Sequence, residues 1–248
     1  MVLDPLLESV NVLSVLATAS LIILTAKSCR ASSVPYLLAI PAGFGLMTVA
    51  FAVQAIEPFL VSFSQLLGAP VEAVWLLMQA YGALFLALAY ARRTRLPWLG
   101  ESTSAALLTA ALATVAFLAI TVLTPTAEAV GGVGSPSGEL FLRAIILAAF
   151  VYLTYETLRN WMLTQKASQG IVTIGYIFFI IEQLGFLLAQ WNLGSVAVFL
   201  AYEGRIMGLF LLNAILIVGI KKADPITVMR RLGLGAPAHD RLQQTVAM

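Results

Sequence analysis

The stretch that decides the fold is Ser195-Val-Ala-Val-Phe-Leu-Ala-Tyr-Glu-Gly-Arg-Ile-Met-Gly-Leu-Phe-Leu-Leu-Asn-Ala-Ile-Leu-Ile-Val-Gly-Ile220. It exceeds the ~20 mostly apolar residues that a helix needs to cross a hydrocarbon core about 30 Å thick. Six more such stretches lie at 6–25, 36–56, 71–91, 104–123, 140–162 and 171–191. Barrel strands would alternate in polarity over about 10 residues. Because these runs are continuously apolar, they predict helices.

Composition points to the same class of protein. Of the 248 residues, 60% are hydrophobic and only 10% are charged, against roughly 25% charged residues in soluble domains. We therefore expect an all-α, polytopic membrane protein with seven transmembrane helices over residues 1–222 and a short amphipathic tail over residues 223–248. The bilayer is its first partner, and the net charge of +2 gives no reason to expect nucleic-acid binding.

Basic residues indicate the orientation. Twelve of the 14 lysines and arginines follow the first, third and seventh stretches or flank the connection from the fifth to the sixth: Lys27, Arg30, Arg92, Arg93, Arg95, Arg159, Lys166, Lys221, Lys222, Arg230, Arg231 and Arg241. Short loops rich in lysine and arginine remain in the cytoplasm. The pattern predicts a multi-pass protein of the cell (plasma) membrane with the N-terminus outside and the C-terminus cytoplasmic.

Three ionisable residues lie deep inside the last two stretches. At 1.5 Å per residue, Glu203 and Arg205 lie ~12 and ~15 Å below residue 195, and Glu182 lies ~17 Å above residue 171. Gln79 and Gln183 reach a comparable depth. Because a charge in hydrocarbon costs at least ~2.5 kcal/mol, such residues usually face a partner, the bundle interior or a water-filled cavity. We expect these five residues to form an ion-pair or ligand-binding cluster.

The spacing also suggests how the cluster pairs. Glu203 and Arg205 are two residues apart and do not share a helix face, so Arg205 needs another partner. Glu182 is the candidate, which leaves Glu203 to pair with another helix or to remain protonated. One interpretation is a structural ion pair that fixes helix register. The other is a polar cavity in which a carboxylate changes protonation or contacts a ligand.

Other polar and small residues favour packing roles. Tyr152, Tyr155 and Glu156 form a second polar stripe near the inner end of the fifth stretch, which is typical of snorkelling and packing. Arg143 is expected to pair with Glu139 one turn earlier. The motif 204–208, with glycine at both ends, predicts close helix approach.

Cofactor and catalytic signatures are missing from the sequence. Cys29 is the only cysteine and His239 the only histidine, which argues against an internal disulfide or a Cys/His zinc site. We expect no metal, no cofactor and no enzyme activity, since the sequence has no catalytic motif. Retinal proteins carry a Schiff-base lysine midway along the last helix, but all four lysines here lie at the cytoplasmic boundary.

A glycine- and proline-rich linker at 124–138 divides the chain into two groups of three stretches around the fourth. Residues 51–54 are similar to 186–190, and residues 82–85 are similar to 208–210. These similarities allow a 3+1+3 arrangement, in which two repeated units of three helices lie on either side of a single fourth helix in the sequence.

The third stretch, Leu77-Met-Gln-Ala-Tyr-Gly-Ala-Leu-Phe-Leu-Ala-Leu-Ala-Tyr-Ala-Arg-Arg93, resembles segments in the seven-helix membrane sensor regions that precede some prokaryotic histidine kinases. The resemblance covers helix count, orientation and the endings of the third and seventh stretches. Because no kinase domain follows here, it implies a separate cytoplasmic signalling partner. It transfers no ligand-binding residues.

The leading hypothesis is therefore a non-retinal, receptor-like or sensor-like protein with a buried polar site, acting with a cytoplasmic partner or as a homo-oligomer. Two alternatives remain. One is a small secondary transporter that uses the same carboxylates, and the other is an accessory membrane subunit of a larger complex.

Overall fold

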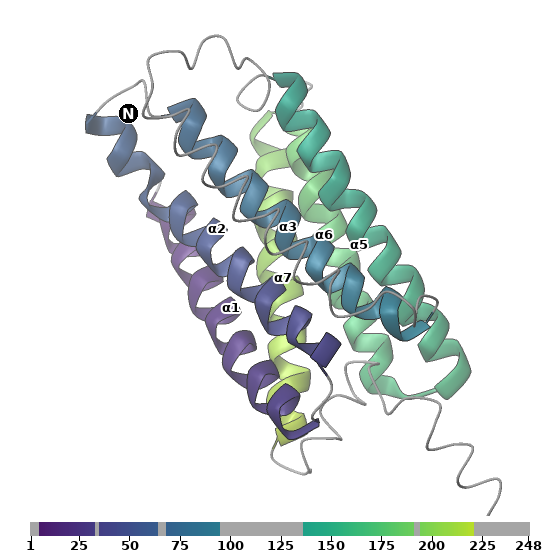
Figure 1. Cartoon of the computed structure of the whole chain (residues 1–248). Coiled ribbons are helices and arrows are strands. Elements are labelled where there is room, and N and C mark those ends of the chain that lie inside the picture. The colour runs from purple at the N-terminus through teal and green to yellow at the C-terminus, as the bar shows by residue number, and fades with distance from the viewer. Residues whose placement is uncertain (1–4, 33–34, 64–67, 95–135, 191–193, 221–248) are drawn as a thin grey trace, which may run out of the picture.

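The computed structural model describes residues 5–32, 35–63, 68–94, 136–190 and 194–220, and all of its regular elements are helical. They are α1 (Pro5–Ser32), η1 (Pro35–Leu38), α2 (Ala39–Phe63), α3 (Gly68–Thr94), α5 (Pro136–Thr164), α6 (Ala167–Gln190) and α7 (Gly194–Ile220). Figure 1 shows them as one elongated bundle.

Six of these helices are long and apolar enough to cross a membrane. This confirms the all-α prediction and is compatible with a multi-pass integral membrane protein. A helix suits hydrocarbon because it satisfies its backbone hydrogen bonds internally. The expected fourth stretch at 104–123 and the tail at 223–248 lie outside the described residues, so the count of seven and the orientation are not established.

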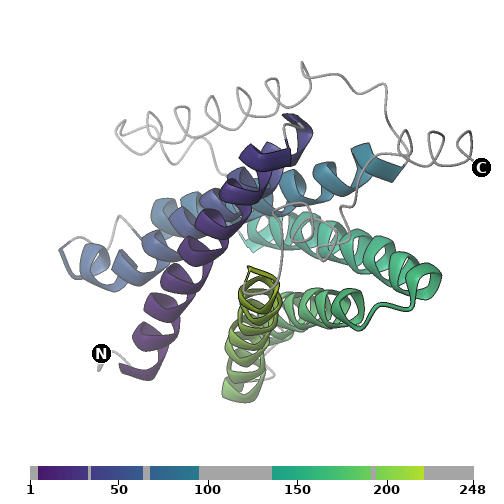
Figure 2. The same cartoon turned by 90° about the horizontal axis from the view of Figure 1, so that it is seen from below.

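The six helices follow one another around a closed ring. Each packs against the next along the chain, and the ring closes where α1 meets α7. Figure 2, seen from below, shows this order, with α7 between α6 and α1. Side chains that face the interior of the ring are buried, including those of Phe51, Phe150 and Arg205.

Helices α3 and α5 are parallel neighbours. Trp75 lies near the start of α3 and Arg143 near the start of α5, and the guanidinium carbon of Arg143 is 5.4 Å from the Trp75 ring centroid. Helices α2 and α6 run in the opposite direction (Figure 1). The last residue of α3 and the first residue of α5 therefore lie at opposite ends of the bundle.

Several helix boundaries match between the two halves of the ring. Adding 132 takes the last residue of α1, Ser32, to the last residue of α5, Thr164, and takes the start of η1 to the start of α6. Adding 126 takes both ends of α3 to both ends of α7. The three long helices before residue 95 thus correspond in order, and closely in length, to the three helices after residue 135.

Buried side chains follow the same register. With an offset of 132, Leu21 and Thr25 of α1 correspond to Leu153 and Thr157 of α5, and all four are buried. The Thr25 hydroxyl donates to the Leu21 carbonyl at 2.6 Å, and the Thr157 hydroxyl donates to the Leu153 carbonyl at 2.9 Å. Helices α1 and α5 therefore present equivalent faces to the ring interior.

Equivalent glycines bring the helix pairs together. A Cβ atom on Gly82 of α3 would lie 2.8 Å from the Gly43 carbonyl oxygen of α2. A Cβ atom on Gly208 of α7 would lie 2.9 Å from the Gly175 carbonyl oxygen of α6. Offsets of 132 and 126 relate these pairs, so α2 packs on α3 by the same backbone contact as α6 on α7. Small residues allow such close approach in lipid.

Candidate functional site

The centre of the bundle holds an ion pair with no exposure. Arg205 Nε of α7 lies 2.7 Å from Glu182 Oε1 of α6, and both side chains are fully buried. The neighbouring Gly204 makes this possible, since a Cβ atom there would lie 2.7 Å from the Phe178 carbonyl oxygen and 2.9 Å from the Glu182 nitrogen. Close backbone packing therefore sets the position of both charged groups.

Three amide side chains from other helices complete the group. Arg205 Nη1 donates to Asn11 Oδ1 of α1 at 3.0 Å and to Gln54 Oε1 of α2 at 2.7 Å. Gln79 Nε2 of α3 donates to Glu182 Oε1 at 3.2 Å. We call these five residues the Arg205 cluster. It joins α1, α2, α3, α6 and α7, and each of its members is buried.

Aromatic rings surround the guanidinium group. The Arg205 guanidinium carbon lies 4.5 Å from the ring centroid of Phe51, 5.2 Å from that of Tyr202 and 5.7 Å from that of Phe186. A cation within about 6 Å of a ring centroid is attracted by the ring quadrupole. These rings supply attraction for the positive charge where hydrocarbon supplies none.

The ion pair is made through one hydrogen bond and not through a two-bond fork. Arg205 Nη2 and Glu182 Oε2 have no hydrogen-bond partner within the described chain, and neither has Gln79 Oε1. Nε and Nη2 form one edge of the guanidinium group, which matches the two oxygens of a carboxylate. The cluster can therefore either close into a two-bond pair or take up a hydroxyl or amide group that accepts from Nη2 and donates to Oε2.

Two of the residues expected in this cluster make no hydrogen bond to its members among the described residues. Gln183 is fully buried beside Glu182, but neither its amide oxygen nor its amide nitrogen has a hydrogen-bond partner among the described residues. Glu203 is exposed on the surface of α7. The structure brings together Gln79, Glu182 and Arg205, adds Asn11 and Gln54, and does not bring in Glu203.

A second buried arginine, Arg143, lies close to the end of the bundle at which α3 and α5 begin. Arg143 Nε lies 2.7 Å from Glu139 Oε1, which confirms the expected pair one turn apart. The Arg143 guanidinium carbon is 4.5 Å from the Phe186 ring centroid, so Phe186 contacts both buried arginines. Glu72 interacts electrostatically with Glu139 and Arg143. The Glu139–Arg143 pair and the Arg205 cluster thus share the Phe186 ring as a neighbour.

The repeat register relates the polar residues of the two halves. An offset of 132 takes Asn11 to Arg143, and an offset of 126 takes Gln79 to Arg205. Each position therefore holds an amide side chain in the first half and an arginine in the second. The interior is symmetric in backbone but asymmetric in charge.

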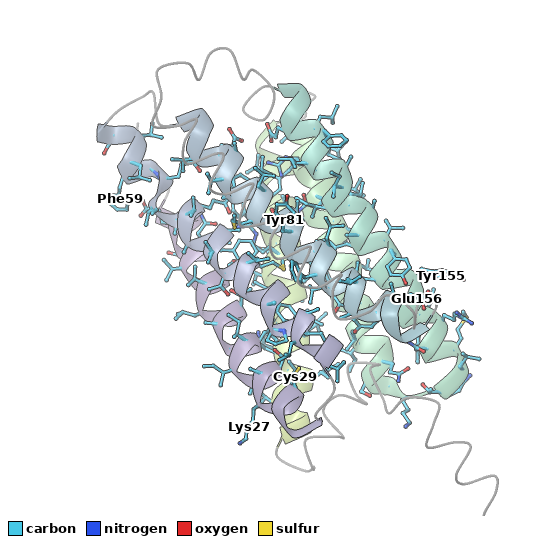
Figure 3. The ribbon with its side chains drawn as sticks, in the orientation of Figure 1. Lys27, Cys29, Phe59, Tyr81, Tyr155 and Glu156 are labelled. Atoms are coloured by element: carbon cyan, nitrogen blue, oxygen red, sulfur yellow. The ribbon has the colours of Figure 1, made fainter. Side chains whose placement is uncertain are left out.

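The three residues of the second polar stripe differ in exposure. Tyr155 is 51% exposed, whereas Glu156 is 1% exposed and Tyr152 packs partly against the hydrophobic core. Figure 3 shows Tyr155 and Glu156 in the part of α5 that leads to its last residue.

Cys29 lies outside the membrane-spanning part of α1. Its side chain is 2% exposed, its Sγ lies 3.1 Å from the Leu37 carbonyl oxygen, and burial raises the thiol pKa to about 12. Figure 3 shows Cys29 beside Lys27, at the end of the bundle opposite Phe59. Within the described ranges, no three His, Cys, Asp or Glu side chains form a group that could hold a metal ion.

Comparisons of the chain with protein-family models, curated proteins and solved structures give no match.

Proposed function

We propose that this chain is a seven-helix, receptor-like or sensor-like membrane protein in which the Arg205 cluster is the responsive element. The observation that carries the proposal is that one fully buried guanidinium group bonds to Glu182, Asn11 and Gln54 on three other helices. A group that binds at Glu182 or neutralises it changes the bonds of Arg205 and therefore acts on α1, α2, α6 and α7 together.

Two arrangements of the ion pair are available to such a switch. In one, Arg205 contacts Glu182 through Nε alone, and its Nη1 donates hydrogen bonds to the side-chain oxygens of Asn11 on α1 and Gln54 on α2. In the other, a hydroxyl or amide group occupies the unpartnered Nη2 and Oε2 atoms. The two states differ in how α6 is held against α7. A bistable contact of this kind converts a local change into a helix shift.

The distribution of charge supports a cytoplasmic output. Lys27 at the end of α1, Arg159 near the end of α5 and Lys166 before α6 lie at one end of the bundle. Lysine and arginine favour the cytoplasmic side. A seventh crossing is supported because α3 ends and α5 begins at opposite ends. A helix shift at the Arg205 cluster would then reach a cytoplasmic signalling partner.

Distance measurements between helix ends test the proposal without a known ligand. Spin labels on Lys27→Cys and Ala167→Cys, in a Cys29→Ala background, report the separation of the inner ends of α1 and α6 in lipid nanodiscs. Glu182→Gln removes the charge but keeps the shape, so it should shift the distance distribution by a few ångströms. Glu57→Gln on α2 is the control, since it removes an acid outside both the cluster and α7. Identical distributions for Glu182→Gln and the parent protein would contradict the proposal.

A second candidate is a secondary transporter with two three-helix units. The equivalent glycine contacts of α2 with α3 and of α6 with α7 favour it, because transporters commonly bind substrate near mid-membrane between repeated units. Proteoliposomes with an imposed pH gradient distinguish the two candidates. Proton-coupled transport predicts dissipation of the gradient that Glu182→Gln reduces, whereas a sensor predicts no protein-dependent dissipation.

A further inference from the structure

Glu203 is an acidic side chain on the outer surface of the bundle. Within the spans of the described helices it is the only exposed aspartate or glutamate. It lies seven residues after Val196, the first residue of the α7 span, so it is about 10 Å inside that span at 1.5 Å per residue. That depth is too great for a short glutamate side chain to reach the headgroups.

The rotation of α7 prevents Glu203 from turning inward. Gly204 and Gly208 on the packed face would place a Cβ atom 2.7 and 2.9 Å from backbone oxygens of α6. Arg205, on the inner side of α7, is bonded to Glu182. These contacts fix which face of α7 is exposed on the outside of the described bundle, and Glu203 belongs to that face.

A carboxyl group without a hydrogen-bond partner is costly in hydrocarbon. Glu203 makes no hydrogen bond or ion pair with another described residue. The surface of α7 around it therefore needs a covering that offers a polar partner at the same depth. Lipid tails cannot supply one.

The exposed residues of α7 follow the spacing of a helix-packing seam. Steps of four and three residues from Val196 give, in order, Leu200, Glu203, Met207 and Phe210. Val196, Leu200, Met207 and Phe210 are 38 to 67% exposed. Alternating steps of three and four describe the seam along which two helices pack side by side, and a single polar residue in such a seam fixes register.

We infer that this seam, formed by Val196, Leu200, Glu203, Met207 and Phe210, binds the same seam of a second copy of this chain. Two copies inserted in one orientation carry Glu203 at the same depth, and a twofold axis along the membrane normal places the two carboxyl groups against each other. A pair of carboxyl groups can share one proton in a hydrogen bond. Each copy thus supplies the polar partner that the other needs.

Crosslinking in a defined membrane tests the interface. Leu200→Cys and Met207→Cys, each in a Cys29→Ala background, are placed in vesicles of phosphatidylcholine and phosphatidylglycerol and oxidised briefly. We expect disulfide-linked dimers from both. The controls are Leu16→Cys on α1 and Ile174→Cys on α6, which are 62% and 44% exposed but lie on other faces. Equal crosslinking at all four positions, or none at 200 and 207, would overturn the inference.

The carboxyl group itself is tested by diluting the protein in vesicles and counting copies by single-molecule photobleaching. Glu203→Leu should weaken dimerisation roughly tenfold, as expected for loss of a polar contact between membrane helices. Glu203→Gln, which keeps a hydrogen-bonding group, should weaken it less. Thermal unfolding of the Glu203→Leu protein reports whether the fold is intact.

Dimerisation that is unchanged by Glu203→Leu would overturn the inference, as would a monomer that purifies with a stoichiometric, different membrane protein. Because Glu203 lies outside the Arg205 cluster, either outcome leaves the proposed function standing. Failure of the spin-label experiment likewise leaves the dimer interface standing.

Discussion

Gln79 and Arg205 occupy equivalent positions in α3 and α7, and both donate a hydrogen bond to the same oxygen atom of Glu182. The carboxylate thus contacts both halves of the ring. One half contributes a neutral amide and the other a charge. This asymmetry within a symmetric backbone defines the Arg205 cluster.

Exchange of the two side chains tests that equivalence. Arg205→Gln alone leaves the buried Glu182 charge unpaired and should lower the free energy of unfolding by about 3 kcal/mol. Adding Gln79→Arg returns a guanidinium group beside Glu182 and should recover part of the loss. Thermal unfolding in detergent measures both. Gln183→Arg in the Arg205→Gln background is the control, and rescue there as large as at position 79 would argue against the equivalence.

The close contact of α6 with α7 gives a second prediction. Gly204→Ala places a Cβ atom 2.7 Å from the Phe178 carbonyl oxygen, so it should lower the free energy of unfolding by about 1 to 3 kcal/mol. Gly45→Ala is the matched control, because no atom lies within 4 Å of the added Cβ atom. That change should be neutral or stabilise the helix by about 0.5 kcal/mol. Equal effects at the two glycines would show that the contact is looser than described.

Cys29 should be inert in the folded protein. Burial raises its thiol pKa from 9.0 to about 12, and the thiolate is the reactive form. A maleimide at pH 8 should label Ala167→Cys rapidly and leave Cys29 unlabelled until the protein is denatured. Because the folded state holds the proton more tightly, this group should make unfolding easier as the pH rises from about 9 toward 12. Rapid labelling of Cys29 in the native protein would contradict its burial.

Depth could be read from the sequence, because every helical residue advances the chain by the same 1.5 Å. Counting residues therefore indicated that Glu182 and Arg205 could meet. Rotation about the helix axis could not be read in the same way. In a membrane, both the lipid-facing side and the packed side of a helix are apolar, so α7 has no polar face to reveal its orientation.

Glu203 shows the consequence. Its depth along the last apolar stretch is close to that of Arg205 and therefore suggests one cluster, yet Glu203 lies on the exposed surface of α7. The motif 204–208 predicts close helix packing, and its two glycines mark the side of α7 that faces α6. The position of Glu203 relative to these glycines is the feature of the sequence that could have shown that Glu203 does not belong to the cluster.

Asn11 and Gln54 were not expected in the cluster. Each is a single amide in a long apolar run, and hydropathy alone does not distinguish such a residue from a surface position. Their role depends on the ring closing between α1 and α7, which is a tertiary feature. The repeat was likewise only partly visible. In the similarity of 82–85 to 208–210, the glycines 82 and 208 have the offset of 126 that relates α3 to α7. The similarity of 51–54 to 186–190 is three residues out of register at its phenylalanines and four at its glutamines.

The most direct test of the account is a double-mutant cycle on the ion pair. Glu182→Gln and Arg205→Gln are made singly and together, and the free energy of unfolding is measured for each protein in the same detergent. The account predicts that the double mutant loses at least about 2 kcal/mol less than the sum of the single losses, because each single change leaves a buried charge unpaired. Losses that add within about 0.5 kcal/mol would mean that the two residues do not interact, and the Arg205 cluster would not exist as described.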